Sequence, residues 1–539
     1  MRKSAFAALG TALIALASAV WADAPSVPVL NWFPCPGVAP GPECAIAQVP
    51  LDYDEPMSAQ TYVVLSKYPA ADQANKIGTV FVNFGGPGIS GVNVLLSGFG
   101  ETLAWLLQDR FDVVAFDPRG VGYSAPLQCF ETAEARAAYL AGLPSFPYLD
   151  EQKRHYFEVL SGLAPICFER GEPIVSHMST ADVARDMDLL RQAVGDEKLT
   201  YLGFSYGSYL GNTYANLFPD KVRALVIDGV LNPLIWTIGR QVASDRVAIE
   251  AVFDEFLRLC DEAAAINPAL CPMSGAQGAA ATYYSLAEVL KVTPVLLPDG
   301  SLYSYDRLIG DTVGCLYSPE AWPYCSAVVA FLSNAVRGDV GAAQQVADAR
   351  AAMLGRLRGG EAARAYNNSF DASYAVQCAD TDYRRPYAVY AALDGWTLKG
   401  SIFGPNWWWG STPCAKWPLA DDRYAGPWTA RTSAPVLIVG NYFDPATDYA
   451  GAVASDQFLK NSRLLSYAGW GHCAFERSDC VRSHVISYLL DGSLPPAGTV
   501  CPANPSPFLP AMSPASTGEG SGLKSRSLTI GLPPLWLER

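Results

Sequence analysis

Residues 200–210 read Thr-Tyr-Leu-Gly-Phe-Ser-Tyr-Gly-Ser-Tyr-Leu, and this stretch decides the fold. It joins the end of an apolar strand to a Gly-x-Ser-x-Gly motif centred on Ser205 and then to a helix. A serine at such a turn is a nucleophile elbow, in which strained backbone lifts the hydroxyl off the sheet. Gly203 and Gly207 leave room for strand and helix to pass closely. A serine in an ordinary glycine-rich turn is the alternative, so the flanking sequence has to decide between them.

The flanking sequence alternates short apolar segments with helical patterns. Strands are expected at 79–83, 112–116, 223–227, 435–440 and 463–467, and helices between them, such as the one that opens near Ser179. Continuous apolar strands separated by helices are typical of a parallel sheet covered on both faces. The sequence therefore predicts an α/β fold with a mostly parallel sheet.

The pattern divides the chain into five parts. We expect a signal peptide at 1–22, the first part of the α/β core at 23–232, and an inserted, mainly helical cap at 233–430. The second part of the core follows at 431–502, and a Pro-, Ser- and Gly-rich tail, expected to be disordered, ends the chain at 503–539. The Trp407–Trp409 cluster either lines a substrate pocket or packs the cap on the core.

Compartment and partners follow from the amino terminus and the charge. Arg2 and Lys3 precede a short apolar run and small-residue cleavage sites around Ala22, as in secretory signal peptides; a membrane anchor is the alternative. We expect a secreted protein without a membrane anchor after cleavage. The formal charge of −14 argues against nucleic acid as a partner.

A hydroxyl nucleophile needs a base, and the base needs an orienting carboxylate. His472 lies in a glycine-flanked turn after a strand, and Asp444 lies in the turn after the preceding strand. Ser205, Asp444 and His472 follow one another in the chain order in which folds with a nucleophile elbow present the nucleophile, the acid and the base. Asp448 is a rival acid, and His484 falls within the closing helix, where a structural role is expected.

The loop 84–91, Phe-Gly-Gly-Pro-Gly-Ile-Ser-Gly, follows a buried strand. No Gly-Lys-Ser/Thr follows it, so a phosphate loop is disfavoured. It is expected to supply the second backbone N–H of an oxyanion hole, with Tyr206 supplying the first. The mechanism needs no metal or organic cofactor, and the sparse histidines without Cys-x-x-Cys disfavour a metal site.

Several ordered motifs resemble prolyl aminopeptidases of the α/β-hydrolase fold, and within them the secreted tripeptidyl aminopeptidases. They are Gly85–Gly88, Asp117–Ser124, Gly203–Gly207, Val376–Asp380, Tyr442–Thr447 and Ser478–Cys480 with Cys501. The resemblance runs from about residue 30 to 502. It implies a serine exopeptidase that removes tripeptides from free amino termini, with Gly86 and Tyr206 as oxyanion hole and Gly85 as the alternative to Gly86.

The thirteen cysteines fit an oxidising compartment, and their odd number leaves at least one unpaired. The resemblance supports pairs Cys35–Cys44, Cys129–Cys167, Cys378–Cys414 and Cys480–Cys501. Proximity in the sequence adds Cys260–Cys271 and Cys315–Cys325, which leaves Cys473 free.

The expected partner is a peptide with a free amino terminus. An esterase or other acyl hydrolase with the same triad is the alternative, and a binding protein on an inactive hydrolase fold is disfavoured by the intact triad. To recognise the free ammonium group of a substrate, one or more carboxylates of the inserted cap are expected to pair with it. Asp380 is the first candidate, and the alternative is that it only caps local structure.

Overall fold

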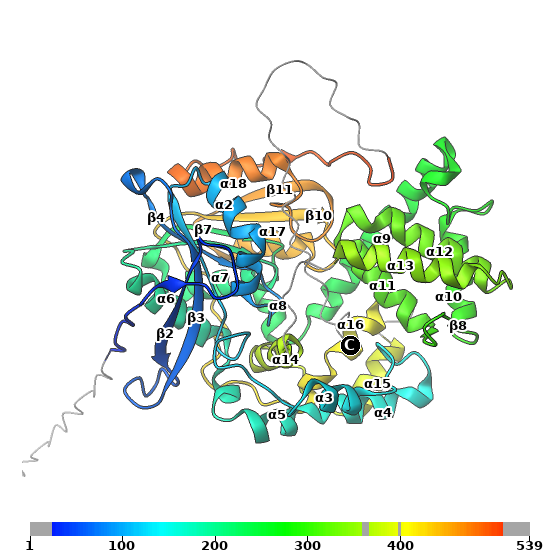
Figure 1. Ribbon diagram of the computed structural model, residues 1–539, viewed down its shortest axis with the longest axis horizontal. Coiled ribbons are helices and arrows are strands. Elements are labelled where there is room, and N and C mark those ends of the chain that lie inside the picture. The colour runs from blue at the N-terminus through cyan, green and yellow to red at the C-terminus, as the bar shows by residue number, and fades with distance from the viewer. Residues whose placement is uncertain (1–23, 358–365, 397–399, 510–539) are drawn as a thin grey trace, which may run out of the picture.

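The computed structural model describes residues 24–357, 366–396 and 400–509. The predicted signal peptide, and residues 510–539 of the predicted tail, lie outside the described residues. Figure 1 shows a lobe built on the sheet, with helices α9–α13 at its side and α3–α5 and α14–α16 below it.

The central sheet has ten strands among the described residues, in the order β1-β2-β3-β5-β4-β6-β7-β10-β11-β12. The first strands pair antiparallel as far as β3 with β5, and all pairs from β5 to β12 are parallel. The predicted α/β fold with a mostly parallel sheet is therefore confirmed. The strands are β1 (Phe33–Pro34), β2 (Glu43–Pro50), β3 (Gln60–Tyr68), β4 (Gly78–Asn83), β5 (Phe111–Phe116), β6 (Leu199–Phe204), β7 (Val222–Asp228), β10 (Val436–Phe443), β11 (Ser462–Trp470) and β12 (Val500–Cys501).

Both faces of the sheet are covered because its central strands are apolar on both sides. In β4, Val80 and Val82 join the cluster formed with α2 (Gly100–Leu106) and α18 (Asp479–Asp491). Phe81 points to the other face and joins a second cluster with α6, α7 and α17. This alternation is the period of two expected of a strand. The helices of that second face are α6 (Thr180–Ala193), α7 (Tyr206–Leu217) and α17 (Tyr449–Phe458).

The segment between β7 and β10, called the cap below, is mainly helical and includes the short antiparallel pair β8 (Val295–Leu296) and β9 (Leu302–Tyr303). A third and largest hydrophobic cluster runs through it. Its helices are α8 (Pro233–Thr237), α9 (Gln241–Ile266), α10 (Ala279–Leu290), α11 (Tyr305–Tyr317), α12 (Trp322–Ala335), α13 (Ala342–Leu357), α14 (Ser369–Asp380), α15 (Tyr387–Trp396) and α16 (Gly404–Gly410).

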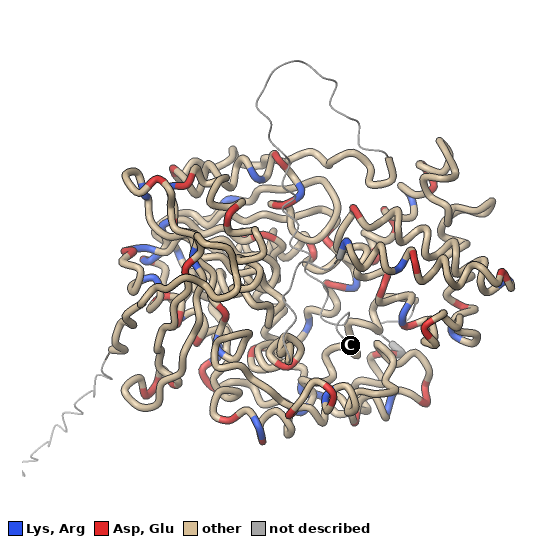
Figure 2. Tube along the Cα trace, viewed as in Figure 1, with Lys and Arg blue, Asp and Glu red and all other residues tan. Residues whose placement is uncertain are grey.

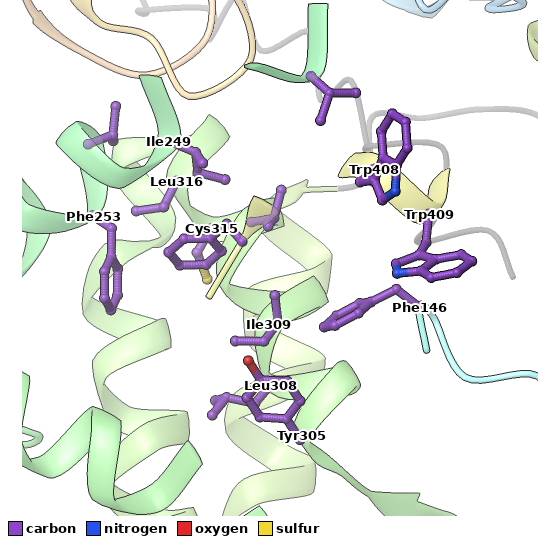
Figure 3. Close-up of a cluster of buried hydrophobic side chains, with 14 of the residues drawn as sticks. Phe146, Ile249, Phe253, Tyr305, Leu308, Ile309, Cys315, Leu316, Trp408 and Trp409 are labelled. Carbon is purple, nitrogen blue, oxygen red and sulfur yellow. The ribbon is translucent and has the colours of Figure 1, made fainter. Parts of the chain in front are cut away.

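Helices from the segment between β5 and β6 pack into the same cluster, although the expected boundaries place them in the first part of the core. They are α3 (Ala133–Leu140), α4 (Asp150–Ser161) and α5 (Leu163–Gly171). Tyr156 of α4 meets Trp409 edge to face, and Figure 3 shows Phe146 between Ile309 and Trp409. Chain order gave no sign of this docking, because the partners are over a hundred residues apart.

All thirteen cysteines lie within the described residues. They form the six expected disulfides, and Cys473 is the one that remains free and is buried. The cysteine assignments are therefore confirmed.

Figure 2 shows acidic and basic residues interspersed along the sheet-containing lobe and along the helices beside it. Among the helices of the described chain, none is both long enough and apolar enough to cross a bilayer.

Candidate active site

Ser205 lies at the turn between β6 and α7, where the sequence predicts an elbow. Its backbone has φ 56° and ψ −122°, a conformation that non-glycine residues rarely adopt. The Ser205 N–H donates to the carbonyl of Asp228 at 2.9 Å, which ties the turn to the end of β7. A Cβ at Gly207 would lie 2.7 Å from the carbonyl oxygen of Asn83, so the motif needs glycine there. The strain and these contacts hold the serine hydroxyl at the carboxyl edge of the sheet.

The glycine-rich loop after β4 lies against this elbow. A Cβ at Gly85 would come within 2.9 Å of the Ser205 Cβ and 3.0 Å of the Tyr206 nitrogen. The N–H of Gly85 already donates to the side-chain oxygen of Asn83 at 3.0 Å, whereas Gly86 lines the cavity above Ser205. Of the two glycines named from the sequence, Gly86 is thus the one whose N–H is not used by Asn83.

Asp444 and His472 meet beside the elbow. His472 Nδ1 lies 2.9 Å and 3.1 Å from the two carboxylate oxygens of Asp444. The carboxylate also accepts the N–H groups of Ala446, Thr447 and Cys473 at 2.9 to 3.1 Å. Burial pushes the pKa of Asp444 upward, but His472 and the backbone donors outweigh it, so the pKa is lowered. Asp444 is therefore held as a carboxylate facing the imidazole.

The other nitrogen of the imidazole faces the cavity. His472 Nε2 is buried and has no hydrogen-bond partner among the described residues, and His472 lines the same cavity as Ser205. The cap also contacts this histidine. The backbone N–H of His472 donates to the carbonyl of Tyr317 at 2.9 Å, and the rings of the two residues meet edge to face. His472 is thus fixed by both the core and the cap.

The rival residues lie elsewhere. Asp448 caps α17 by accepting the Ala450 N–H at 3.0 Å, and it also accepts from Ser244 in the cap. His484 lies within α18, as expected from its position in the closing helix. Neither residue lines the cavity that holds Ser205 and His472.

Asp228 contributes to the site, although the sequence did not single it out. Its carboxylate is fully buried and accepts the N–H groups of Ala474 and Phe475, two and three residues after His472, at 2.8 to 3.0 Å. Its carbonyl accepts from Ser205. Burial raises the pKa of Asp228 to about 6, against the effect of the two N–H donors. One residue therefore joins the serine turn to the histidine loop. Its place at the carboxyl end of an apolar strand was the available signal.

The cavity over Ser205 has a volume of about 150 Å³ and is walled largely by the cap. Its lining is mostly apolar and aromatic, including Trp236, Tyr317 and Trp407. Trp407 thus lies on the cavity, while Trp408 and Trp409 are buried in the cap (Figure 3). Trp407 therefore has the position that the pocket interpretation expects, whereas Trp408 packs on Tyr390 of the cap and Trp409 meets Tyr156 of α4.

Asp380 does not line this cavity. It is buried, and its carboxylate accepts the backbone N–H of Thr180, the first residue of α6, at 3.2 Å. The Thr180 hydroxyl also donates to Asp380 and is hydrogen-bonded to the hydroxyl of Tyr206. The capping alternative describes these contacts, and the structure does not bring Asp380 to the substrate cavity. Among the described lining residues the acidic one is Asp245 of α9, which no sequence pattern marked.

Comparison with known proteins shows which protein family this chain is related to. A family model described as "alpha/beta hydrolase fold" matches residues 79–247, and one described as "TAP-like protein" matches residues 400–501. Serine protease Hip1 of Mycobacterium tuberculosis is 31% identical over 506 residues, which cover 88% of this chain and 91% of that protein. The chain belongs to the TAP-like α/β-hydrolases.

Two further relatives of this TAP-like hydrolase carry different activities in their names. The tripeptidyl aminopeptidase of Streptomyces coelicolor is 30% identical over 472 residues, covering 86% of this chain and 84% of that protein. Carboxylesterase B of Mycobacterium tuberculosis is 33% identical over 467 residues, covering 85% and 86%. Identity alone therefore does not separate a peptidase from an esterase.

Proposed function

We propose that this TAP-like hydrolase is a secreted serine aminopeptidase that releases short peptides, tripeptides in particular, from free amino termini. The observation that carries the hydrolase chemistry is the Asp444–His472 pair beside the strained Ser205. Two relatives named serine protease and tripeptidyl aminopeptidase, together with the TAP-like match, favour peptide substrates. The six disulfides and the signal-like amino terminus support an oxidising, extracellular location.

In the proposed mechanism Ser205 Oγ attacks the scissile carbonyl while His472 Nε2 takes its proton. Asp444 holds the Nδ1–H tautomer, which leaves Nε2 free to accept, and stabilises the imidazolium that forms. Among the described residues Nε2 has no hydrogen-bond partner, so within them the proton transfer breaks no existing hydrogen bond of that nitrogen.

The tetrahedral oxyanion would be held by the backbone N–H groups of Gly86 and Tyr206. The first residue of α7 is Tyr206, so the partial positive charge of the helix N-terminus adds to this stabilisation. His472 then gives its proton to the leaving amine, and the acyl group of the released peptide stays on Ser205. Water, deprotonated by His472, hydrolyses this ester and restores the serine.

An esterase is the second candidate, favoured by the carboxylesterase relative. Three substrates separate the two functions: a tripeptide p-nitroanilide, its N-acetyl derivative, and p-nitrophenyl butyrate. We expect the free anilide to be cleaved, and acetylation to lower kcat/KM by about 10²-fold or more. Equal cleavage of free and acetylated peptides would make the protein a broader acyl hydrolase. Turnover of the ester with neither anilide cleaved would make it an esterase.

A further inference from the structure

Helix α9 carries two polar residues on a face that is otherwise apolar and buried. Gln241, Asp245, Ile249 and Phe253 recur every four residues and so share one side of the helix. Figure 3 shows Ile249 and Phe253 within the hydrophobic cluster of the cap. Gln241 and Asp245, which lie two turns and one turn before Ile249, are 4% and 6% exposed and line the cavity that holds Ser205. Polar side chains in such a place cost free energy unless they find a partner.

The two side chains satisfy each other only in part. Gln241 Nε2 donates to Asp245 Oδ1 at 2.6 Å, which fixes the amide so that its oxygen is free. Gln241 Oε1 is buried, and within the described part of the chain it has no hydrogen-bond partner. For Asp245, the described residues supply no other hydrogen bond and no ion pair. The pair therefore presents mainly acceptors, the amide oxygen of Gln241 and the carboxylate of Asp245, beside the second N–H of the Gln241 amide.

The electrostatics indicate which kind of ligand is missing. Burial raises the pKa of Asp245 well above its usual range, and the Asp448 and Asp444 carboxylates raise it further, against the effect of Gln241. No Lys or Arg is among the described residues that line the cavity. A cationic group with several N–H donors would supply both the charge and the hydrogens that these acceptors lack.

We infer that Asp245 and Gln241 form the binding site for the α-ammonium group of the substrate. The inference rests on the proposed aminopeptidase function, since it places the free amino terminus in the cavity that holds Ser205. An ammonium group has three N–H donors, so it can bond to the carboxylate and the amide oxygen together. Trp236 lines the same cavity, and its indole N–H, buried and without a partner in the described ranges, is available to a peptide carbonyl. Acceptors for an amine and a donor for a carbonyl suit the end of a peptide.

The test compares free and N-acetylated tripeptide p-nitroanilides on wild type, Asp245→Asn and Gln241→Leu. For Asp245→Asn we expect kcat/KM on the free peptide to fall by about 10²-fold, close to the value for the acetylated one. For Gln241→Leu a smaller loss of about tenfold is expected, because the carboxylate remains. Hydrolysis of p-nitrophenyl butyrate, which has no amino group, should change by less than about threefold in both variants and so reports correct folding.

Asp254→Asn is the matched control, since Asp254 lies on the same helix but is exposed. It should retain the wild-type preference for the free peptide. An N-acetylated tripeptide with lysine first in the chain distinguishes the α-ammonium from a side-chain ammonium: we expect it to be cleaved as slowly as other acetylated peptides. Its rapid cleavage would assign the site to a lysine side chain and overturn the inference.

The outcomes separate the inference from the proposed function. If wild type cleaves free and acetylated peptides equally, the aminopeptidase proposal fails and the site has no substrate amine to bind. If wild type prefers the free peptide and both variants keep that preference, only the assignment to Asp245 and Gln241 is wrong. Should Asp245→Asn fail to fold, Gln241→Leu decides, and an unchanged preference in that variant overturns the inference.

Discussion

Replacement of Asp444 by asparagine changes the histidine tautomer while keeping the shape of the site. The oxygen that accepts from Ala446 and Thr447 is retained, because the amide oxygen takes its place. The amide NH₂ then faces His472 Nδ1 and the Cys473 N–H, where the carboxylate accepted. An NH₂ group can only donate to Nδ1, so it favours the ring that carries its hydrogen on Nε2 and cannot take the proton of Ser205; the retained oxygen, 2.9 Å from Nδ1, competes as an acceptor for the other tautomer.

We expect kcat of Asp444→Asn to fall by about 10³- to 10⁴-fold, the usual result of holding the wrong tautomer in a serine triad. This corresponds to about 4 to 5.5 kcal/mol of transition-state stabilisation, at 1.36 kcal/mol for each factor of ten. The lost acceptor for the Cys473 N–H should cost about 1 to 3 kcal/mol of stability, so the variant remains folded.

The assay measures kcat and KM for a tripeptide p-nitroanilide, with thermal unfolding of the same samples. Asp448→Asn is the matched control, because Asp448 is the neighbouring carboxylate and caps α17 without contacting His472. Its kcat should change by less than about threefold. A kcat for Asp444→Asn within tenfold of wild type, or an equal loss in Asp448→Asn, would refute the reasoning.

Three further predictions concern residues around the site. Asp228→Asn should lower kcat by about tenfold or more with KM changed less than about threefold, because the amide NH₂ in the place of Oδ1 would face the Ala474 N–H at 3.0 Å, and two opposed donors shift the loop that holds His472; unchanged kcat would remove its positioning role. Gly85→Ala should lower kcat/KM by about 10²-fold, because the added Cβ would lie 2.5 Å from the carbonyl oxygen of Phe204. Gly142→Ala is the control: its φ is similar, a Cβ there has nothing within 4 Å, and kcat/KM should stay unchanged. Burial raises the pKa of Asp380 to about 7, so folding favours its protonated form. Relative to Asp380→Asn, wild type should therefore lose about 4 kcal/mol of unfolding free energy as pH rises from about 4 to 8. Urea denaturation of both proteins measures this, and a difference in unfolding free energy between them that does not change with pH would contradict it.

Local signals in the sequence were enough for the sheet and for most of the triad environment. The elbow around Ser205, and the turns that hold Asp444 and His472, each follow a strand directly, so chain order and strand ends predict that they meet. The cysteine pairs were accessible for other reasons: the family resemblance implied four of them, and closeness in sequence suggested Cys260–Cys271 and Cys315–Cys325.

Contacts between distant segments were not accessible in this way. Phe146 and Tyr156 pack on cap residues far along the chain, and no periodicity shows which lobe an amphipathic helix will cover. Asp380 was chosen for its place in a motif, yet its neighbours are Thr180 and Tyr206. Asp245 went unnoticed because one acidic residue in a long helix is ordinary until the helix is known to line a cavity.

Product analysis on a decapeptide tests whether Ser205 removes peptides from free amino termini. The purified protein is incubated with the peptide and with its N-acetylated copy, and the products are identified by mass spectrometry over time. We expect stepwise release of tripeptides from the free amino end, little cleavage of the acetylated copy, and a loss of about 10³-fold or more in folded Ser205→Ala. Internal cleavage of the acetylated peptide, or full activity of Ser205→Ala, would contradict this expectation.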